Sequence, residues 1–70
     1  MNLSARNRIN GTVTSVEMGV VNAEVVVEVA PGVEITAMIT KQSAQTLGLD
    51  VGKEVQVVIK ASNVMVGTGS

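Results

Sequence analysis

The chain has 70 residues, a formal net charge of −1, and neither cysteine nor histidine. This composition excludes disulfides and thiolate metal sites and leaves almost no route to structural zinc. The small charge and the lack of Phe, Tyr and Trp argue against nucleic acid, which binds basic patches and aromatic stacking surfaces.

Domains of this size rarely gain more than about 3–5 kcal/mol from one core, and many rely on disulfides, metals or partner subunits. Because 46% of the residues are hydrophobic, we expect part of this aliphatic surface to be buried between subunits. No apolar run approaches the roughly 20 residues of a membrane span, and the first residues lack the apolar core of a signal peptide. We therefore expect a cytoplasmic protein with no membrane partner.

The first predicted strand covers residues 6–17, and Gly11 within it indicates a bend or a close backbone approach. One face of this strand would carry Ile9, Gly11, Val13 and Ser15. A turn is predicted at Met18-Gly19. The strongest strand follows over residues 20–30, with an apolar face made by Val21, Ala23, Val25, Val27 and Val29.

Pro31-Gly32 predicts a turn into a return strand over residues 33–40. Thr40 as N-cap and Gly48 as the residue past the end then predict a two-turn helix. A strand over residues 54–59, a polar corner over 60–63 and a brief last strand over 64–66 complete the chain. This order predicts an all-β, five-stranded OB-like barrel with one short helix between strands 3 and 4, assembled as an oligomer.

Two short polar segments stand near the ends of the chain, Ser4-Ala5-Arg6-Asn7 and Lys60-Ala61-Ser62-Asn63. Each joins one cation to small hydroxyl or amide side chains and uncrowded backbone. Folded together, they would offer the donors and positive charge that a small oxyanion needs. The alternative is that Arg6 and Lys60 are ordinary solvated charges in weak surface ion pairs.

Two further places could offer donors. Ser43 would lie in the first turn of the helix, where free N–H groups favour anions, although simple capping explains it equally well. The turn formed by Gly19, Val20, Val21 and Asn22 could face its copies across a symmetry axis, or could be a plain strand connection. No catalytic nucleophile, base or phosphate-binding loop is visible, so we expect no enzyme activity and no cofactor.

Several runs of the sequence closely resemble the molbindins, small cytoplasmic molybdate-binding proteins made of a single Mop domain. These runs are Ser-Ala-Arg-Asn at 4–7, Gly-Val-Val-Asn-Ala-Glu-Val at 19–25, Ile-Thr-Ala-Met-Ile-Thr at 35–40, Ser-Ala-Gln-Thr-Leu-Gly-Leu at 43–49 and Val-Ile-Lys-Ala-Ser-Asn-Val-Met at 58–65. The resemblance covers nearly the whole chain, so it implies one Mop domain over residues 1–70. Only the Gly-Thr-Gly-Ser tail carries no family motif.

The resemblance implies an OB-like hexamer, a trimer of dimers, that holds oxyanions between subunits. One class of site would use Ser4, Ala5 and Arg6 with Lys60 and Ala61, and Ser43 of a neighbouring chain. A second class would lie near the threefold axis, at Gly19, Val20, Val21 and Asn22. No residue would ligate a metal cation directly, because the donors suit intact molybdate or tungstate.

The sequence thus favours non-enzymatic binding of molybdate or tungstate for intracellular storage. The alternative is an anion-sensing interaction module that acts through a partner protein. A nucleic-acid-binding OB domain is disfavoured by the charge and by the missing aromatic residues.

Overall fold

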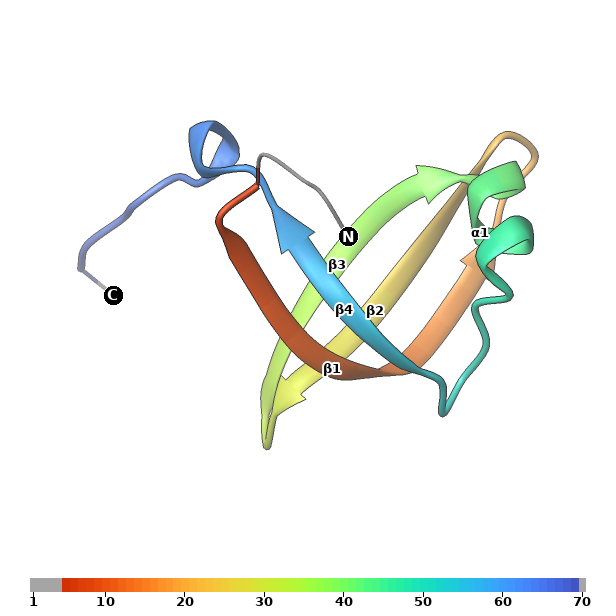
Figure 1. Ribbon diagram of the computed structural model, residues 1–70, viewed down its shortest axis with the longest axis horizontal. Helices are drawn as coiled ribbons and strands as arrows, with labels where there is room; N and C mark the ends of the chain where they lie inside the picture. The colour runs from red at the N-terminus through yellow and green to blue at the C-terminus, as the bar shows by residue number, and fades with distance from the viewer. Residues whose placement is uncertain (1–4, 70) are drawn as a thin grey trace.

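The computed structural model describes residues 5–69 and contains one antiparallel sheet with a short helix (Figure 1). The strands are β1 (Asn7–Met18), β2 (Asn22–Ala30), β3 (Val33–Thr40) and β4 (Glu54–Ile59), in the spatial order β3-β2-β1-β4. Helix α1 (Lys41–Leu47) lies between β3 and β4, and a single 3₁₀ turn, η1 (Ala61–Asn63), follows β4. Ser4, one of the predicted site residues, lies outside the described residues.

The small core lies on the concave side of the curled sheet. Its centre is Val13 of β1 with Val25 and Val27 of β2, all at most 4% exposed. Side chains from every strand and from the segment after α1 pack around it: Val16, Val29, Ile39, Leu49, Val55 and Val57. The alternation of apolar residues along β2 therefore places Ala23, Val25, Val27 and Val29 on the inner face as the sequence predicts. The prediction is wrong at Val21, which precedes the strand and is 69% exposed.

A β-bulge in β1 explains where the predicted alternation is wrong. The register with β2 shifts between Val13 and Ser15, so one extra residue is inserted there. Beyond the bulge the inward position passes to Val16, which packs on the core, while Ser15 is exposed. Of the residues predicted to share one face, Ile9, Gly11, Val13 and Ser15, only Gly11 and Val13 are buried, and Ile9 is 40% exposed.

Gly11 confirms the predicted close backbone approach. A Cβ atom at this position would lie 2.6 Å from Val27 Cγ1 and 2.7 Å from the Glu28 carbonyl oxygen. These distances are shorter than real Cβ contacts allow. Only glycine lets β1 bend across β2 at this point.

Helix α1 begins and ends at the two predicted capping residues. Thr40 Oγ1 accepts the Ser43 N–H at 3.0 Å, and Gly48 has the left-handed conformation with φ of 63°. The Lys53 ammonium group donates to the carbonyl oxygens of Leu47 and Gly48 at the C-terminal end. Ala44 is the buried residue of the helix and packs α1 against the rest of the chain.

The fold class is confirmed, a mostly β, OB-like fold with one short helix between the third and fourth strands. The fifth strand expected over residues 64–66 is not formed within residues 5–69. Val64 has extended backbone, with φ of −87° and ψ of 127°, but the segment belongs to no strand of the sheet. A strand needs a partner edge, and after η1 the chain runs away from the sheet (Figure 1). Within residues 5–69, no helix is long and apolar enough to cross a membrane.

Candidate functional site

The start of β1 and the end of β4 lie side by side, which brings the two polar segments of the sequence together. The antiparallel register pairs Asn7 with Ile59 and Arg8 with Val58. The side-chain amide of Asn7 donates to the Ile59 carbonyl at 3.1 Å and is partly buried. This bond reinforces the last residue pair between β1 and β4. Residues before Asn7 and after Ile59 no longer belong to the sheet.

Because Asn7 pairs with Ile59, the next residues along the two strands, Arg6 and Lys60, lie opposite each other. Both side chains are exposed, so their charges face solvent at the same end of the sheet. A doubly negative anion at this end of the sheet would be attracted by both charges. Ala5 precedes Arg6 and is half-buried.

Ala61 opens the 3₁₀ turn that follows Lys60. The two bonds of this turn are donated by Asn63 to the Lys60 carbonyl at 2.9 Å and by Val64 to the Ala61 carbonyl at 3.3 Å. The first N–H groups of a helical turn have no acceptor inside it, and those of Ala61 and Ser62 are of this kind. Backbone donors therefore stand beside the two cations.

Ser43 lies at the opposite end of the molecule, on α1 (Figure 1). Its Oγ accepts a hydrogen bond from Thr40 Oγ1 at 2.8 Å, which leaves the Ser43 hydroxyl proton to donate elsewhere. The side chain is exposed and lines a shallow surface hollow with Gln42, Thr46 and Leu47. One chain cannot bring Ser43 to Arg6, so a shared site requires a second copy.

The turn of the second predicted site lies beside the start of α1. The Gly19 N–H donates to the Asn22 carbonyl at 2.7 Å, and the Lys41 N–H donates to the Val21 carbonyl at 2.7 Å. The Gly19 donor is thus used inside the turn, and the donors left for an anion are the N–H groups of Val20 and Val21 and the Asn22 amide. Val20 and Val21 are 93% and 69% exposed, so the turn presents an apolar surface around those donors.

Of the five described residues of the first predicted site, Ala5, Arg6, Lys60 and Ala61 therefore lie at one end of the sheet. The fifth, Ser43, lies at the other end together with the turn at 19–22. Asn7 was not predicted as a site residue, although it stands next to Arg6 in the sequence. Its bond to the Ile59 carbonyl joins β1 to β4 next to Arg6, and an amide at the start of a strand is the signal that could have indicated it. Within residues 5–69, no three His, Cys, Asp or Glu side chains gather in a way that could hold a metal ion.

Comparisons with known proteins identify the family of the chain. A family model described as the TOBE domain matches residues 3–66. The chain belongs to the TOBE domain family, and the resemblance to single-domain Mop proteins is confirmed. Molybdenum-pterin-binding protein 1 of Clostridium pasteurianum is 44% identical over 66 residues, which cover 94% of this chain and 97% of that protein.

Solved structures of the same kind superpose closely. A molybdate-binding protein from Sporomusa ovata matches with a TM-score of 0.90 at 34% identity, covering 97% of this chain and all of that one. The cytoplasmic molybdate-binding protein ModG, solved with molybdate bound, matches with a TM-score of 0.92 at 49% identity. That match covers 99% of this chain and 49% of the ModG chain.

Proposed function

We propose that this chain is a single Mop domain that binds molybdate or tungstate without catalysing a reaction and stores the anion in the cytoplasm. The anion would be held between subunits of a homo-hexamer, a trimer of dimers. The similarity to molybdate-binding proteins supports molybdate as the ligand, and the similarity to ModG, a cytoplasmic protein, supports the location.

The observation that carries the proposal is the meeting of Arg6 and Lys60 across the β1–β4 register. A guanidinium fork and a compact ammonium group approach a tetrahedral anion from two sides. The backbone N–H groups of Ala5 and Ala61 lie next to them, and Ser4 precedes them in the sequence. Ser43 of another copy would contribute its free hydroxyl proton.

The donors are numerous enough for useful affinity. A hydrogen bond to a charged group contributes about 1.5–3 kcal/mol, and micromolar binding needs about −8 kcal/mol. Several such bonds reach that value after the costs of desolvation and ordering are subtracted. Selection against the smaller sulfate ion would follow from the fixed distance between donors on two rigid subunits.

Titration calorimetry with molybdate, tungstate and sulfate tests this function. We expect saturable heat with molybdate or tungstate, retention of that anion after dialysis, and weak or no heat with sulfate. No heat and no retained anion with either oxyanion would disprove the proposed function.

Charge-removing variants test the site itself. Arg6→Ala and Lys60→Ala should each weaken one class of site about tenfold or more, because each removes a charge-assisted bond of about 1.5–3 kcal/mol. The charge-matched control is Lys53→Ala, which removes a cation from the other end of β4, about 20 Å away at roughly 3.3 Å per residue. Because Lys53 also bonds the last carbonyls of α1, circular dichroism must show that this variant keeps its helix. Equal affinity for the parent and both site variants would refute the assignment of Arg6 and Lys60.

The alternative, an anion-sensing module, requires a partner protein. A pull-down from cell extract with and without molybdate separates the two functions. A stoichiometric partner gained or lost with the anion would favour sensing, and its absence would favour storage.

A further inference from the structure

The hydroxyl groups of Thr40 and Ser43 form a short chain of hydrogen bonds at the start of α1. The Ser43 N–H donates to Thr40 Oγ1 at 3.0 Å, and Thr40 Oγ1 donates to Ser43 Oγ at 2.8 Å. Each hydroxyl group has one proton to donate. Because the Thr40 proton is used on Ser43 Oγ, the Ser43 proton is the one that remains for a ligand.

Thr40 is the last residue of β3, and its position is fixed by the sheet. It lies opposite Asn22 in the β2–β3 ladder, and the following Lys41 N–H donates to the Val21 carbonyl at 2.7 Å. A helix of 7 residues is too short to be stable by itself, so the strand is the rigid partner of the two elements. The hydrogen-bond chain thus begins on a fixed residue and ends on an exposed side chain.

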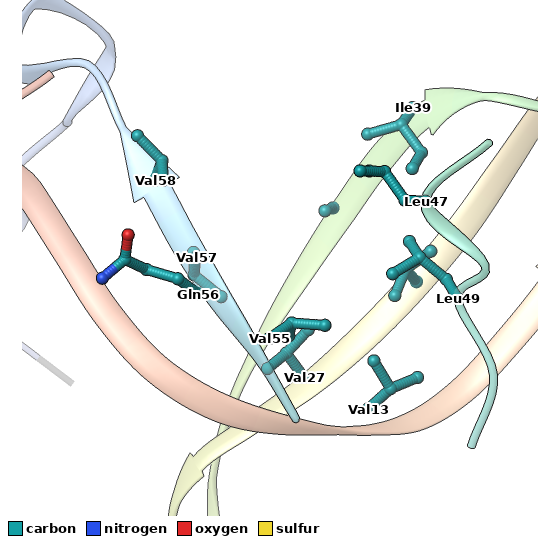
Figure 2. Close-up of a pocket in the computed structure, with 11 residues that line it drawn as sticks. Val13, Val27, Ile39, Leu47, Leu49, Val55, Gln56, Val57 and Val58 are labelled. Carbon is teal, nitrogen blue, oxygen red and sulfur yellow. The ribbon is translucent and has the colours of Figure 1, made fainter. Parts of the chain in front are cut away.

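The other end of α1 is held by packing and backbone bonds. Leu49, just past the helix, packs on the core, and its N–H donates to the Ala44 carbonyl at 3.1 Å. Figure 2 shows Leu47 and Leu49 beside the apolar cavity inside the curled sheet, which both residues line. These contacts locate the backbone of α1, but they do not determine where the exposed Ser43 hydroxyl points.

The Thr40 hydroxyl supplies the missing constraint on Ser43. A serine side chain has three staggered rotamers, and the bond from Thr40 favours the one that brings Oγ within 2.8 Å of Thr40 Oγ1. A donor that is already oriented loses less conformational freedom when it binds a ligand. The Ser43 N–H is engaged by Thr40, so the hydroxyl is the donor that this residue can present to a ligand.

We propose that Thr40 is a positioning residue of the oxyanion site. Its hydroxyl turns the Ser43 proton outward, toward an anion held by Arg6 and Lys60 of another copy, and Thr40 itself does not touch the anion. This inference rests on the proposed function, because it requires an anion shared between copies.

A double-mutant cycle on molybdate affinity tests the inference. Titration calorimetry compares the parent with Thr40→Val, Ser43→Ala and the double variant. We expect each single variant to weaken one class of site about threefold to tenfold, the range for one hydrogen bond. The double variant should bind no more weakly than Ser43→Ala, because Thr40 acts only through Ser43 and the two losses are not additive.

Two further variants separate the hydroxyl of Thr40 from the rest of its side chain. Thr40→Ser keeps the hydroxyl and should bind molybdate as the parent does. The matched control is Thr36→Val, the same substitution at an exposed position of the same strand, which should also leave the affinity unchanged. Circular dichroism checks that each variant keeps its helix.

Thr40→Asp provides the measurement if Thr40→Val loses the helix. Aspartate is a favoured N-cap, but its carboxylate can only accept, so the Ser43 proton turns inward. The added negative charge also repels the anion, whether or not Ser43 is present. Thr40→Asp should therefore weaken binding more in the parent than in the Ser43→Ala protein.

Three results would overturn the inference while leaving the proposed function intact, because the parent binds molybdate in all of them. Thr40→Val could bind as tightly as the parent, or Ser43→Ala could do so. The variants at Thr40 could also lose the same affinity with and without Ser43, which would mean that Thr40 acts on folding alone. A parent that gives no heat with molybdate refutes the proposed function and this inference with it.

Discussion

Gly11 is the residue at which β1 comes closest to β2. The missing side chain leaves room for Val27 Cγ1 and the Glu28 carbonyl, each within 2.7 Å of where a Cβ atom would be. Neither neighbour can withdraw easily, since Val27 is 4% exposed and the carbonyl belongs to the backbone of a paired strand. The close approach of β1 to β2 thus depends on the absence of a Cβ atom at Gly11.

Gly11→Ala should therefore lower the free energy of unfolding by about 1–3 kcal/mol, as overpacking of a core does. Urea unfolding followed by circular dichroism measures the change. The control is Ser15→Ala on the exposed side of the same strand, which should stay within about 0.5 kcal/mol of the parent. A Gly11→Ala protein as stable as the parent would show that β1 and β2 can separate at no cost.

Glu34 directly opposes Glu28 in the β2–β3 ladder, and both side chains are exposed. Like charges in such a pair are destabilising, and opposite charges contribute roughly 0.2–1 kcal/mol. Glu34→Lys should raise the free energy of unfolding by that order, and Glu34→Gln should give a smaller gain. The difference should shrink in high salt, because salt screens exposed charges; a gain independent of salt would point to another cause.

At the scale of elements, helix α1 depends on its caps, because an isolated helix of 7 residues is far below the length that is stable in water. Thr40 satisfies the Ser43 N–H and also holds the Ser43 hydroxyl. The same residue therefore determines both where the helix begins and how a candidate anion donor is oriented.

Thr40→Val keeps the shape of the side chain but removes its oxygen, and should cost about 1 kcal/mol of stability. Thr40→Ser keeps the oxygen and should cost much less. Thermal unfolding of the two variants and the parent measures how much the Thr40 cap contributes to stability. A larger loss in Thr40→Ser than in Thr40→Val would show that the methyl group, and not the hydrogen bond, is what α1 needs.

Elements with local signals could be predicted from the sequence. The caps at Thr40 and Gly48 act over three or four residues, and the alternation along β2 directly reflects its buried face. The bulge near Thr14 could not be predicted, because it depends on how β1 bends over β2. Residues 64–66 look like a strand, yet a strand exists only when an edge is available to pair with it.

In the candidate site, too, some features could be predicted from the sequence and others depend on the fold. Residue types alone marked Arg6 and Lys60 as anion donors, and the register explains how they meet. The separation of Ser43 from them is a property of the whole topology, which no short stretch of sequence contains. The bond of Asn7 to Ile59, beside Arg6, likewise appears only when β1 and β4 are paired.

At the scale of the whole molecule, the apolar surface is too large for the core that one chain makes. Large hydrophobic side chains stay more than 60% exposed between β1 and β2, on β3, on the loop before β4 and on the segment after η1: Val20, Val21, Met38, Val51, Met65 and Val66. Surface of this kind on a small domain marks a protein interface. Among residues 5–69, Val13 is the one side chain larger than alanine that is fully buried.

Association of copies should therefore supply much of the stability, and stability should depend on protein concentration. A hundredfold increase in concentration adds about 2.7 kcal/mol per mole of dimer to the apparent free energy of unfolding, by mass action. Urea midpoints measured at two concentrations that far apart should differ clearly, and the difference should largely vanish in Val66→Glu. Ser15→Glu, at an exposed polar position of β1, should keep the full dependence. A midpoint that ignores concentration, with a particle of 7.2 kDa in solution, would mean that this small core is sufficient by itself.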